Sequence, residues 1–161
     1  MTRTHTSSRS NRRGFSLVEL AVVVIIIGVL AAFGVPRFRD SVERAKASEA
    51  FAFLSAIRSA QERYQARSGI YAVKLGDLDI QMSPPKYFKD SAGVAITAET
   101  AIDTSASVEK NPTWTLALKR DKLSSSYGDY SVIFTEQGLD VADSTIVTDT
   151  DLNQRINPVA N

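Results

Sequence analysis

Residues 12–38, RRGFSLVELAVVVIIIGVLAAFGVPRF, decide the fold of this chain. From Phe15 to Val35 the side chains are apolar or small, with Glu19 as the one charge. A helix of this length is ~32 Å long, which matches the ~30 Å hydrocarbon core of a bilayer. The stretch therefore predicts a membrane-spanning helix that carries a single carboxylate near its start.

The charges on either side of this run predict its orientation. Residues 1–14 contain four arginines and no acidic residue: Arg3, Arg9, Arg12 and Arg13. The remaining residues carry 15 basic and 18 acidic side chains, a net charge of −3. Because positive flanks stay in the cytoplasm, we expect the N-terminus inside and the bulk of the chain exported. A basic face with interleaved aromatic residues is missing from the sequence, so a nucleic-acid partner is not expected.

Two kinds of N-terminal processing fit such a segment. A secretory signal has an apolar region of ~7–15 residues followed by a small-residue cleavage site. The run here is longer, and residues 31–34 offer only a weak site of that kind. Gly14 lies before the run and is the better processing mark, while conventional cleavage stays an alternative.

Glu19 has two interpretations. A lone carboxylate near the end of a membrane helix is tolerated, at up to ~2–3 kcal/mol at mid-bilayer. Alternatively, a positive charge from another copy of the chain neutralises it, and cleavage after Gly14 would create such a charge on the α-amino group of Phe15. An intramembrane ionisable group favours the second interpretation.

The segment GFSLVEL, the unbroken apolar run and GVPRF together resemble the N-terminus of type IV pilins and of type II secretion pseudopilins. The resemblance implies cleavage between Gly14 and Phe15 by a prepilin peptidase, N-methylation of Phe15, and pairing of Glu19 with the Phe15 amine of a neighbouring subunit during filament assembly. It also implies an inner-membrane assembly platform with a cytoplasmic ATPase as partner. The position of Glu19 argues against the tip pseudopilin, which lacks this acid.

Three residues in or directly after the run bear on how the helix packs and bends. Gly28 and Ala32 stand in a small-x-x-x-small relation that permits close helix approach. Pro36 disfavours helical geometry at Val35 and predicts a kink there, as in pilin helices.

Helical spacing continues beyond the membrane to Ser68, where Gly69 is a suitable stop. The helix is predicted from Phe15 to Ser68, with its intervening charged and glutamine side chains facing water. Its packing stripe is a set of apolar residues at helical spacing, Phe38, Val42, Ala45, Phe53, Leu54, Ile57 and Tyr64. In the connection after the helix, Tyr71 and Leu78 are placed much as in pilins. Ala72 stands where pilins frequently have a proline, and this departure is minor.

The rest of the chain predicts an antiparallel sheet. The segments GVAIT, TWTLALKR and YGDYSVIFT are rich in β-branched and aromatic residues, whereas MSPPKYFKD predicts a turn. The final residues predict a polar tail, in which STIVT is a candidate edge strand. The expected fold is α+β, a long N-terminal helix packed on a small antiparallel sheet, with a leader at 1–14, a transmembrane helix at 15–36 and an exported pilin-like head at 37–161.

Chemistry at a conventional active site is not expected. The chain has no cysteine, and its one histidine, His5, lies in the leader. Histidine-based catalysis, thiol chemistry and ordinary zinc sites are thereby excluded from the processed chain. No cofactor is expected, with calcium on the acidic tail as a minor alternative to a solvated tail. The acidic residues concerned are Asp140, Asp143, Asp149 and Asp151.

The sequence therefore predicts a filament subunit that polymerises from the inner membrane with copies of itself and related pilins. It leaves open a surface pilus or a periplasmic secretion pseudopilus. Major pseudopilins carry a calcium-binding loop near the C-terminus, and the spacing of the acidic residues here does not reproduce it, which weakens the major-pseudopilin assignment. A membrane-anchored binding protein that does not polymerise is the alternative from another class. An exported enzyme would need catalytic residues that the chain lacks.

Overall fold

The computed structural model describes residues 14–104, 113–121 and 125–160. The chain divides into two compact units, Met1–Phe38 and Arg39–Asn161, and each is described by itself. We call the second unit the head.

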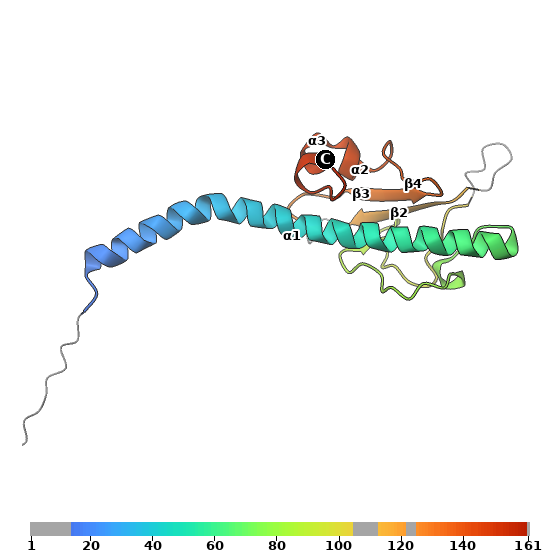
Figure 1. Ribbon diagram of the computed structural model, residues 1–161, viewed down its shortest axis with the longest axis horizontal. Helices are drawn as coiled ribbons and strands as arrows, with labels where there is room; N and C mark the ends of the chain where they lie inside the picture. The colour runs from blue at the N-terminus through green and yellow to red at the C-terminus, as the bar shows by residue number, and fades with distance from the viewer. Residues whose placement is uncertain (1–13, 105–112, 122–124, 161) are drawn as a thin grey trace, which may run out of the picture. The chain divides into compact units, whose positions relative to one another are not determined.

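The first helix, α1, runs from Leu17 to Ser68 and continues through Pro36 (Figure 1). It ends at Gly69, whose φ of 77° lies in the left-handed region that glycine tolerates best. The Gly69 amide donates to the main-chain oxygen of Gln65 at 2.8 Å, which closes the last turn. The predicted helix and its glycine stop are confirmed.

The head contains a four-stranded antiparallel sheet in the order β1-β2-β3-β4. The strands are β1 (Phe88–Lys89), β2 (Thr115–Arg120), β3 (Ser131–Thr135) and β4 (Gly138–Leu139). In the central pair, Leu116 lies opposite Phe134 and Leu118 opposite Val132, so the buried side chains of both strands share one face. A short 3₁₀ turn, Leu75–Asp77, follows α1. The predicted α+β fold, a long helix packed on a small antiparallel sheet, is confirmed.

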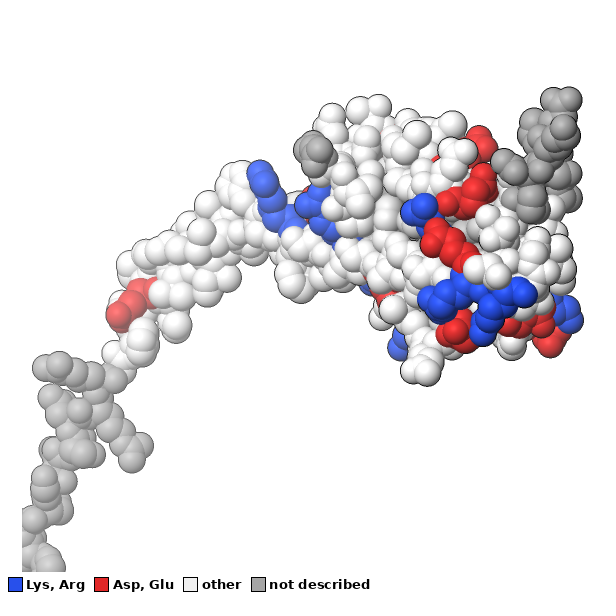
Figure 2. Space-filling model, turned by 45° about the vertical axis from the view of Figure 1, so that its right-hand side comes forward, with Lys and Arg blue, Asp and Glu red and all other residues white. Residues whose placement is uncertain are grey.

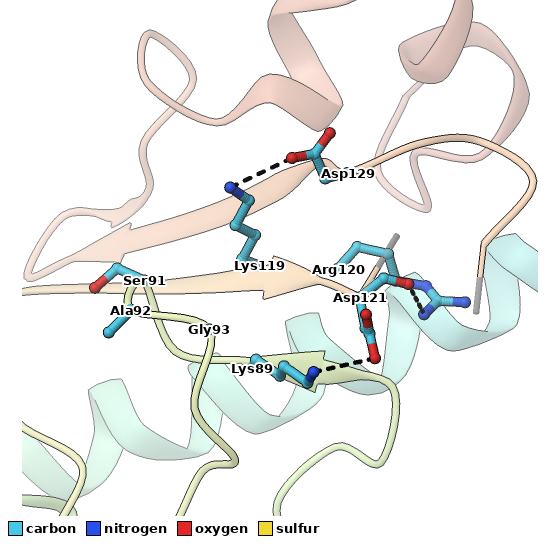
Figure 3. A pocket seen from close by; sticks show the side chains of 8 residues that line it. All are labelled: Lys89, Ser91, Ala92, Gly93, Lys119, Arg120, Asp121 and Asp129. Atoms are coloured by element: carbon cyan, nitrogen blue, oxygen red, sulfur yellow. Dashed lines mark hydrogen bonds and ion pairs between the residues drawn. The ribbon is translucent and has the colours of Figure 1, made fainter. Parts of the chain in front are cut away.

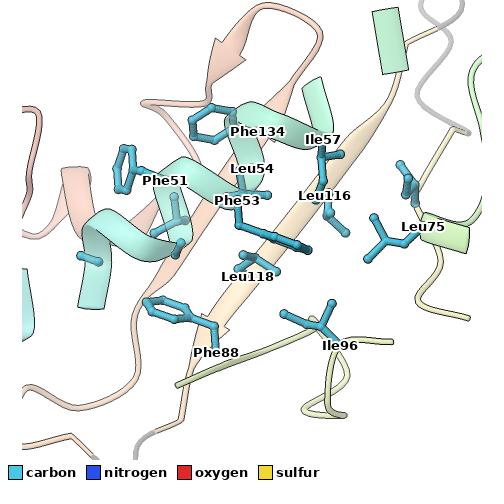
Figure 4. Packing of buried hydrophobic residues seen from close by; sticks show 14 of the residues in the cluster. Phe51, Phe53, Leu54, Ile57, Leu75, Phe88, Ile96, Leu116, Leu118 and Phe134 are labelled. Atoms are coloured by element: carbon cyan, nitrogen blue, oxygen red, sulfur yellow. The ribbon is translucent and has the colours of Figure 1, made fainter. Parts of the chain in front are cut away.

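Apolar side chains from α1 and the central strands form the core of the head (Figure 4). Leu54 and Ile57 of α1 are fully buried, as are Leu118 and Val132 of the sheet. The rings of Phe51 and Phe134 meet edge to face, with their centroids 5.9 Å apart. The outer half of α1 is thereby fixed to the sheet through the later part of the predicted stripe, Phe53, Leu54 and Ile57, whereas Ala45 of that stripe is exposed.

The packing face of α1 begins later than the sequence suggests. Phe38 is 70% exposed and Val42 is 38% exposed, so neither belongs to the core. Glu43 and Gln61 were expected to face water, yet both are buried. Gln61 bonds both polar groups of Ala72, with its NH₂ group donating to the Ala72 oxygen and its oxygen accepting from the Ala72 amide. Each misplaced polar residue has partners that periodicity does not reveal.

The first edge of the sheet also differs from the prediction. GVAIT forms no named strand and contributes only an isolated bridge between Ala95 and Lys89. Phe88 and Lys89, predicted in a turn, form β1 instead. Burial of Phe88 and Ile96 in the core explains the apolar character of both segments. The tip of the predicted hairpin between β2 and β3 includes residues 122–124, which lie outside the described residues.

The C-terminal segment is folded onto the sheet, so the prediction of a polar tail with an edge strand is wrong. STIVT contributes helix α2 (Thr145–Thr148), and α3 (Thr150–Arg155) follows it. Ile146 and Ile156 are fully buried. Ser144 Oγ accepts from the Ile133 amide at 2.9 Å, which ties α2 to β3. Apolar burial and hydrogen bonds thus hold this segment without a disulfide.

Candidate functional site

The predicted processing and assembly residues lie at the start of α1. Gly14 and Phe15 precede the helix, and Glu19 stands in its first turn. All three are exposed, and Phe15 is 72% exposed. Among the described residues, none lies within ion-pair distance of Glu19. The described part of the chain therefore supplies the carboxylate without supplying its counter-charge.

The first half of α1 is long and apolar enough to cross a membrane. Its large apolar side chains from Phe15 to Val35 are between 44% and 83% exposed. Such a continuous apolar surface marks an interaction with lipid or protein, because water-exposed patches of soluble chains are far smaller. Figure 2 shows this surface free of basic side chains, with red at the position of one acidic group near its start.

Glycines in this segment are not needed for packing within the subunit. A Cβ added at Gly14 or Gly28 would meet no heavy atom within 4 Å. Gly14 and Gly28 also have no positive φ, so their backbone conformation does not require glycine. Contacts within the described residues therefore do not require a small residue at Gly14 or Gly28.

A buried ion pair, which sequence reasoning missed, joins α1 to the end of β2. Arg120 Nε donates to Glu43 Oε1 at 2.6 Å, and its Nη2 donates to Oε2 at 3.2 Å. The Tyr130 hydroxyl donates to Oε1 at 3.0 Å. Arg120 Nη1 donates to the main-chain oxygen of Tyr87 at 3.0 Å. Nothing in the sequence distinguishes Glu43 from its exposed neighbours, because Arg120 and Tyr130 are 77 and 87 residues away.

The surroundings of Glu43 act on its pKa in opposite directions. Burial raises the pKa of Glu43, but the hydrogen bonds and positive charge of Arg120, aided by Tyr130 and Lys46, outweigh it. The net pKa lies below the ordinary glutamate value. The carboxylate stays ionised inside the head and holds the guanidinium as its counter-charge.

A second polar contact is centred on Asp40, three residues before Glu43 in the chain. The Tyr127 hydroxyl donates to Asp40, and Arg155 Nη2 donates to the same Asp40 oxygen at 2.8 Å. The Arg155 guanidinium also lies over the Tyr127 ring, 5.2 Å from its centroid. Burial, together with the hydrogen bond to Asp40 and its negative charge, raises the pKa of Tyr127 to about 12.

Alkaline pH should destabilise the head through Tyr127. A phenol whose folded pKa is raised stabilises the fold fully below its unfolded pKa of about 10. That contribution disappears as the pH rises through about 12. We expect the wild-type chain in detergent to lose stability more steeply between pH 10 and 12 than Tyr127→Phe, as measured by urea unfolding.

Tyr130 leaves a residual slope in the Tyr127→Phe variant, because burial and Glu43 also raise the pKa of Tyr130. Asp40→Asn, which removes the charge at the acceptor, should reduce the slope as well. Equal slopes for the wild type and Tyr127→Phe would contradict this assignment.

The acidic residues of the C-terminal segment have structural roles. Asp140 Oδ1 accepts from the amides of Ala142 and Asp143, and Asp149 caps the start of α3. Asp151 pairs with Arg155 at 3.1 Å. In the described part of the chain, no three acidic, histidine or cysteine side chains are grouped to hold a metal ion.

An open cavity of about 220 Å³ lies beside the end of β2 (Figure 3). Its two lysines are paired with carboxylates, Lys89 with Asp121 at 3.2 Å and Lys119 with Asp129 at 3.3 Å. Because each lysine already has a counter-charge, this cavity offers no excess charge for an ionic ligand.

Comparison with known proteins places the similarity in the N-terminal segment. Residues 9–35 match the prokaryotic N-terminal methylation motif. A fimbrial protein of Eikenella corrodens, EcpC, is 38% identical over 60 residues, which cover 37% of this chain and 39% of that protein. The type IV narrow pilus major component PilA5 of Thermus thermophilus is 48% identical over 48 residues, 30% of this chain and 41% of that protein. The type IV major pilin PilA of Myxococcus xanthus is 43% identical over 60 residues, 37% of this chain and 27% of that protein.

The matched region thus spans about two fifths or less of these curated relatives. No solved structure matches the chain. The methylation motif covers the residues that carry the predicted processing site and Glu19, and α1 packs on an antiparallel sheet as expected for a pilin. On these grounds the chain carries the N-terminal methylation motif, is similar to type IV pilins over part of its length, and has a pilin-like α+β fold.

Proposed function

We propose that this chain is the structural subunit of a type IV pilus filament, with a mechanical rather than a catalytic role. The observation that carries the proposal is the exposed apolar half of α1, which holds one carboxylate, Glu19, in its first turn. No residue that the structure describes forms an ion pair with Glu19. Such a surface needs lipid before assembly and neighbouring apolar helices afterwards. Similarity to pilins or fimbrial proteins of three bacteria supports it.

In this proposal a prepilin peptidase cleaves between Gly14 and Phe15, and Phe15 is N-methylated. Gly14 is exposed and precedes α1, so its peptide bond lies outside the hydrogen-bonded helix. The new amine of Phe15 then pairs with Glu19 of a neighbouring subunit. A charge pair left half-made in an apolar bundle is penalised, so the pair would select the correct register between subunits.

The proposed location follows from the same features. The leader at 1–14 stays in the cytoplasm, the segment 15–36 spans the inner membrane, and the head from residue 37 is exported. An assembly platform with a cytoplasmic ATPase would then move the subunit into an extracellular filament. Gly28 and Pro36 are proposed to serve helix packing and bending in that filament.

A surface pilus is favoured over a secretion pseudopilus by two observations. The relatives named above are pilins or fimbrial proteins by name. The described acidic residues near the C-terminus are used as caps and ion pairs rather than grouped as metal ligands.

Mass spectrometry of the native N-terminal peptide tests the proposal. We expect a peptide that begins with N-methylated Phe15 in material sheared from the cell surface. The same peptide confined to the membrane would favour a pseudopilus or an unassembled pool. A chain that keeps residues upstream of Gly14 in both fractions would leave only a membrane anchor and overturn the filament role.

A further inference from the structure

Two arginines at the start of the head differ from most basic side chains farther along it. Arg39 and Arg44 are exposed, and neither has an ion-pair partner among the described residues. The carboxylates nearest in sequence are already engaged, Asp40 by Arg155 and Glu43 by Arg120. Pairs farther along the head include Lys74 with Glu99, Arg63 with Asp79, Lys89 with Asp121 and Lys119 with Asp129.

Arg44 is held in place by a neutral group, and no described residue supplies a counter-charge within ion-pair distance. Its Nε and Nη2 donate to the main-chain oxygen of Asn157 at 3.2 and 2.9 Å. A carbonyl orients the guanidinium without supplying a negative charge. The order that a binding site must impose on a long arginine side chain is therefore already present in the fold.

Arg44 also borders an open cavity of about 220 Å³, together with Asn153, Gln154 and Ala160. Asn153 Oδ1 accepts from Asn157 Nδ2 at 2.7 Å, which leaves the Asn153 NH₂ group to donate. A fixed guanidinium beside two primary amides is a donor set suited to a phosphate group with neighbouring hydroxyls. We call this hollow the Arg44 cavity.

The position of these arginines in the sequence favours a lipid headgroup as the ligand that carries the phosphate. Arg39 and Arg44 come within nine residues of Val35, where the apolar run ends. Figure 2 shows basic side chains along α1 where its uncharged stretch ends. Side chains on a helix lean toward its N-terminus, and arginine reaches toward the lipid interface while its stem remains in an apolar setting.

We propose that Arg39 and the Arg44 cavity bind the headgroups of anionic phospholipids in the outer leaflet of the inner membrane, and so retain the subunit before assembly. This inference rests on the proposed membrane span of α1. The head is otherwise mildly acidic, so these arginines attract an anionic surface that the rest of the head repels. Each basic residue near such a surface strengthens binding by about fivefold.

The test uses the full-length, processed chain in nanodiscs that contain equal amounts of phosphatidylglycerol and phosphatidylcholine. After mild extraction, native mass spectrometry measures the ratio of the two lipids retained per chain. We expect phosphatidylglycerol to be enriched in the wild type, with the enrichment reduced about fivefold in Arg39→Gln and about 25-fold in Arg39→Gln/Arg44→Gln. Arg44→Lys keeps the charge but loses the guanidinium that Asn157 fixes, so its enrichment should fall between those of the wild type and Arg44→Gln.

Arg67→Gln is the matched control, because Arg67 is exposed, has no ion-pair partner among the described residues and lies at the far end of α1. Equal losses in Arg67→Gln and Arg39→Gln, or an unchanged ratio in the double variant, would overturn the inference. Loss of enrichment when inorganic phosphate is added at constant ionic strength would also overturn it, by making free phosphate the ligand. A chain that does not insert into nanodiscs at all would instead contradict the membrane span.

Discussion

Replacing Glu43 with alanine is expected to destabilise the head by about 3–5 kcal/mol, because the buried Arg120 would lose its counter-charge. The Arg120 side chain is 0% exposed and the Glu43 side chain 4% exposed, so water cannot replace the lost carboxylate. A typical domain is stable by only ~5–15 kcal/mol, so the variant should be close to unfolding at ambient temperature.

Urea unfolding of the full chain in detergent measures this effect. Trp114 is the only tryptophan and is fully buried in the core of the head, so its fluorescence reports unfolding of the head. Glu62→Ala is the matched control, since Glu62 pairs with Arg58 at 3.4 Å on the same helix but its side chain is 57% exposed. An exposed pair of this kind contributes ~0–1 kcal/mol.

The double replacement Glu43→Leu/Arg120→Met distinguishes the loss of the whole ion pair from the loss of one of its two charges. Removing both charges also removes the desolvation penalty of each, so the double variant should be much more stable than Glu43→Ala. Tyr130 would then lose an acceptor, which limits the recovery. A double variant as unstable as Glu43→Ala would show that packing around the pair, rather than its charge balance, determines the loss.

Acid should act on the same pair. Because the folded pKa of Glu43 lies below its ordinary value, Glu43 stabilises the fold above its unfolded pKa of about 4.5. That contribution is lost as the pH falls through the lower, folded pKa. The wild type should therefore lose stability in this acid range, and the double variant, which lacks the carboxylate, should lose less.

The helix and the central strands could be predicted because their signals are local and repeated. Leu54 and Ile57 recur at helical spacing, and Leu116 and Leu118 alternate as a half-buried strand requires. Each is found in the core. The N-terminal motif was equally readable, since its glycine, glutamate and apolar run lie within one short stretch.

The polar interior and the edges of the head could not be predicted, for physical reasons. Glu43 is buried because Arg120 at the end of β2 and Tyr130 just before β3 reach it from far along the chain. Helical periodicity carries no information on such partners. STIVT has the composition of a strand, but Ile146 packs into the core from a short helix. Tertiary contacts decided the conformation of so short a segment, against its local propensity.

The largest functional effect is expected from Glu19→Ala, which should leave membrane insertion and cleavage intact but exclude the chain from filaments. An unpaired carboxylate at mid-bilayer depth is unfavourable by ~2–3 kcal/mol, and pairing with the Phe15 amine of a neighbour would remove that penalty. At 1.4 kcal/mol per factor of ten, correctly paired subunits should be favoured by about 30- to 100-fold at each addition.

Coexpression measures this preference directly. When wild type and variant are expressed equally, the ratio of the two in sheared filaments, divided by their ratio in the membrane, gives the relative incorporation. We expect about 0.03 or less for Glu19→Ala, which follows from the 1.4 kcal/mol per factor of ten. Glu19→Gln keeps the length and a hydrogen-bonding oxygen, so a value as low as that of alanine would assign the effect to charge.

Glu62→Ala again serves as control, because it removes one exposed carboxylate from the same helix outside the apolar run and should incorporate with a relative value near one. If Glu19→Ala incorporates as well as Glu62→Ala, the carboxylate is merely tolerated in lipid and the proposed pairing with Phe15 is wrong. If Glu19→Ala instead inserts into the membrane better than the wild type yet stays out of filaments, membrane insertion and filament assembly depend on different features of the segment. The apolar run then determines insertion, and the carboxylate within it determines assembly, at a position where lipid alone would have favoured an uncharged residue.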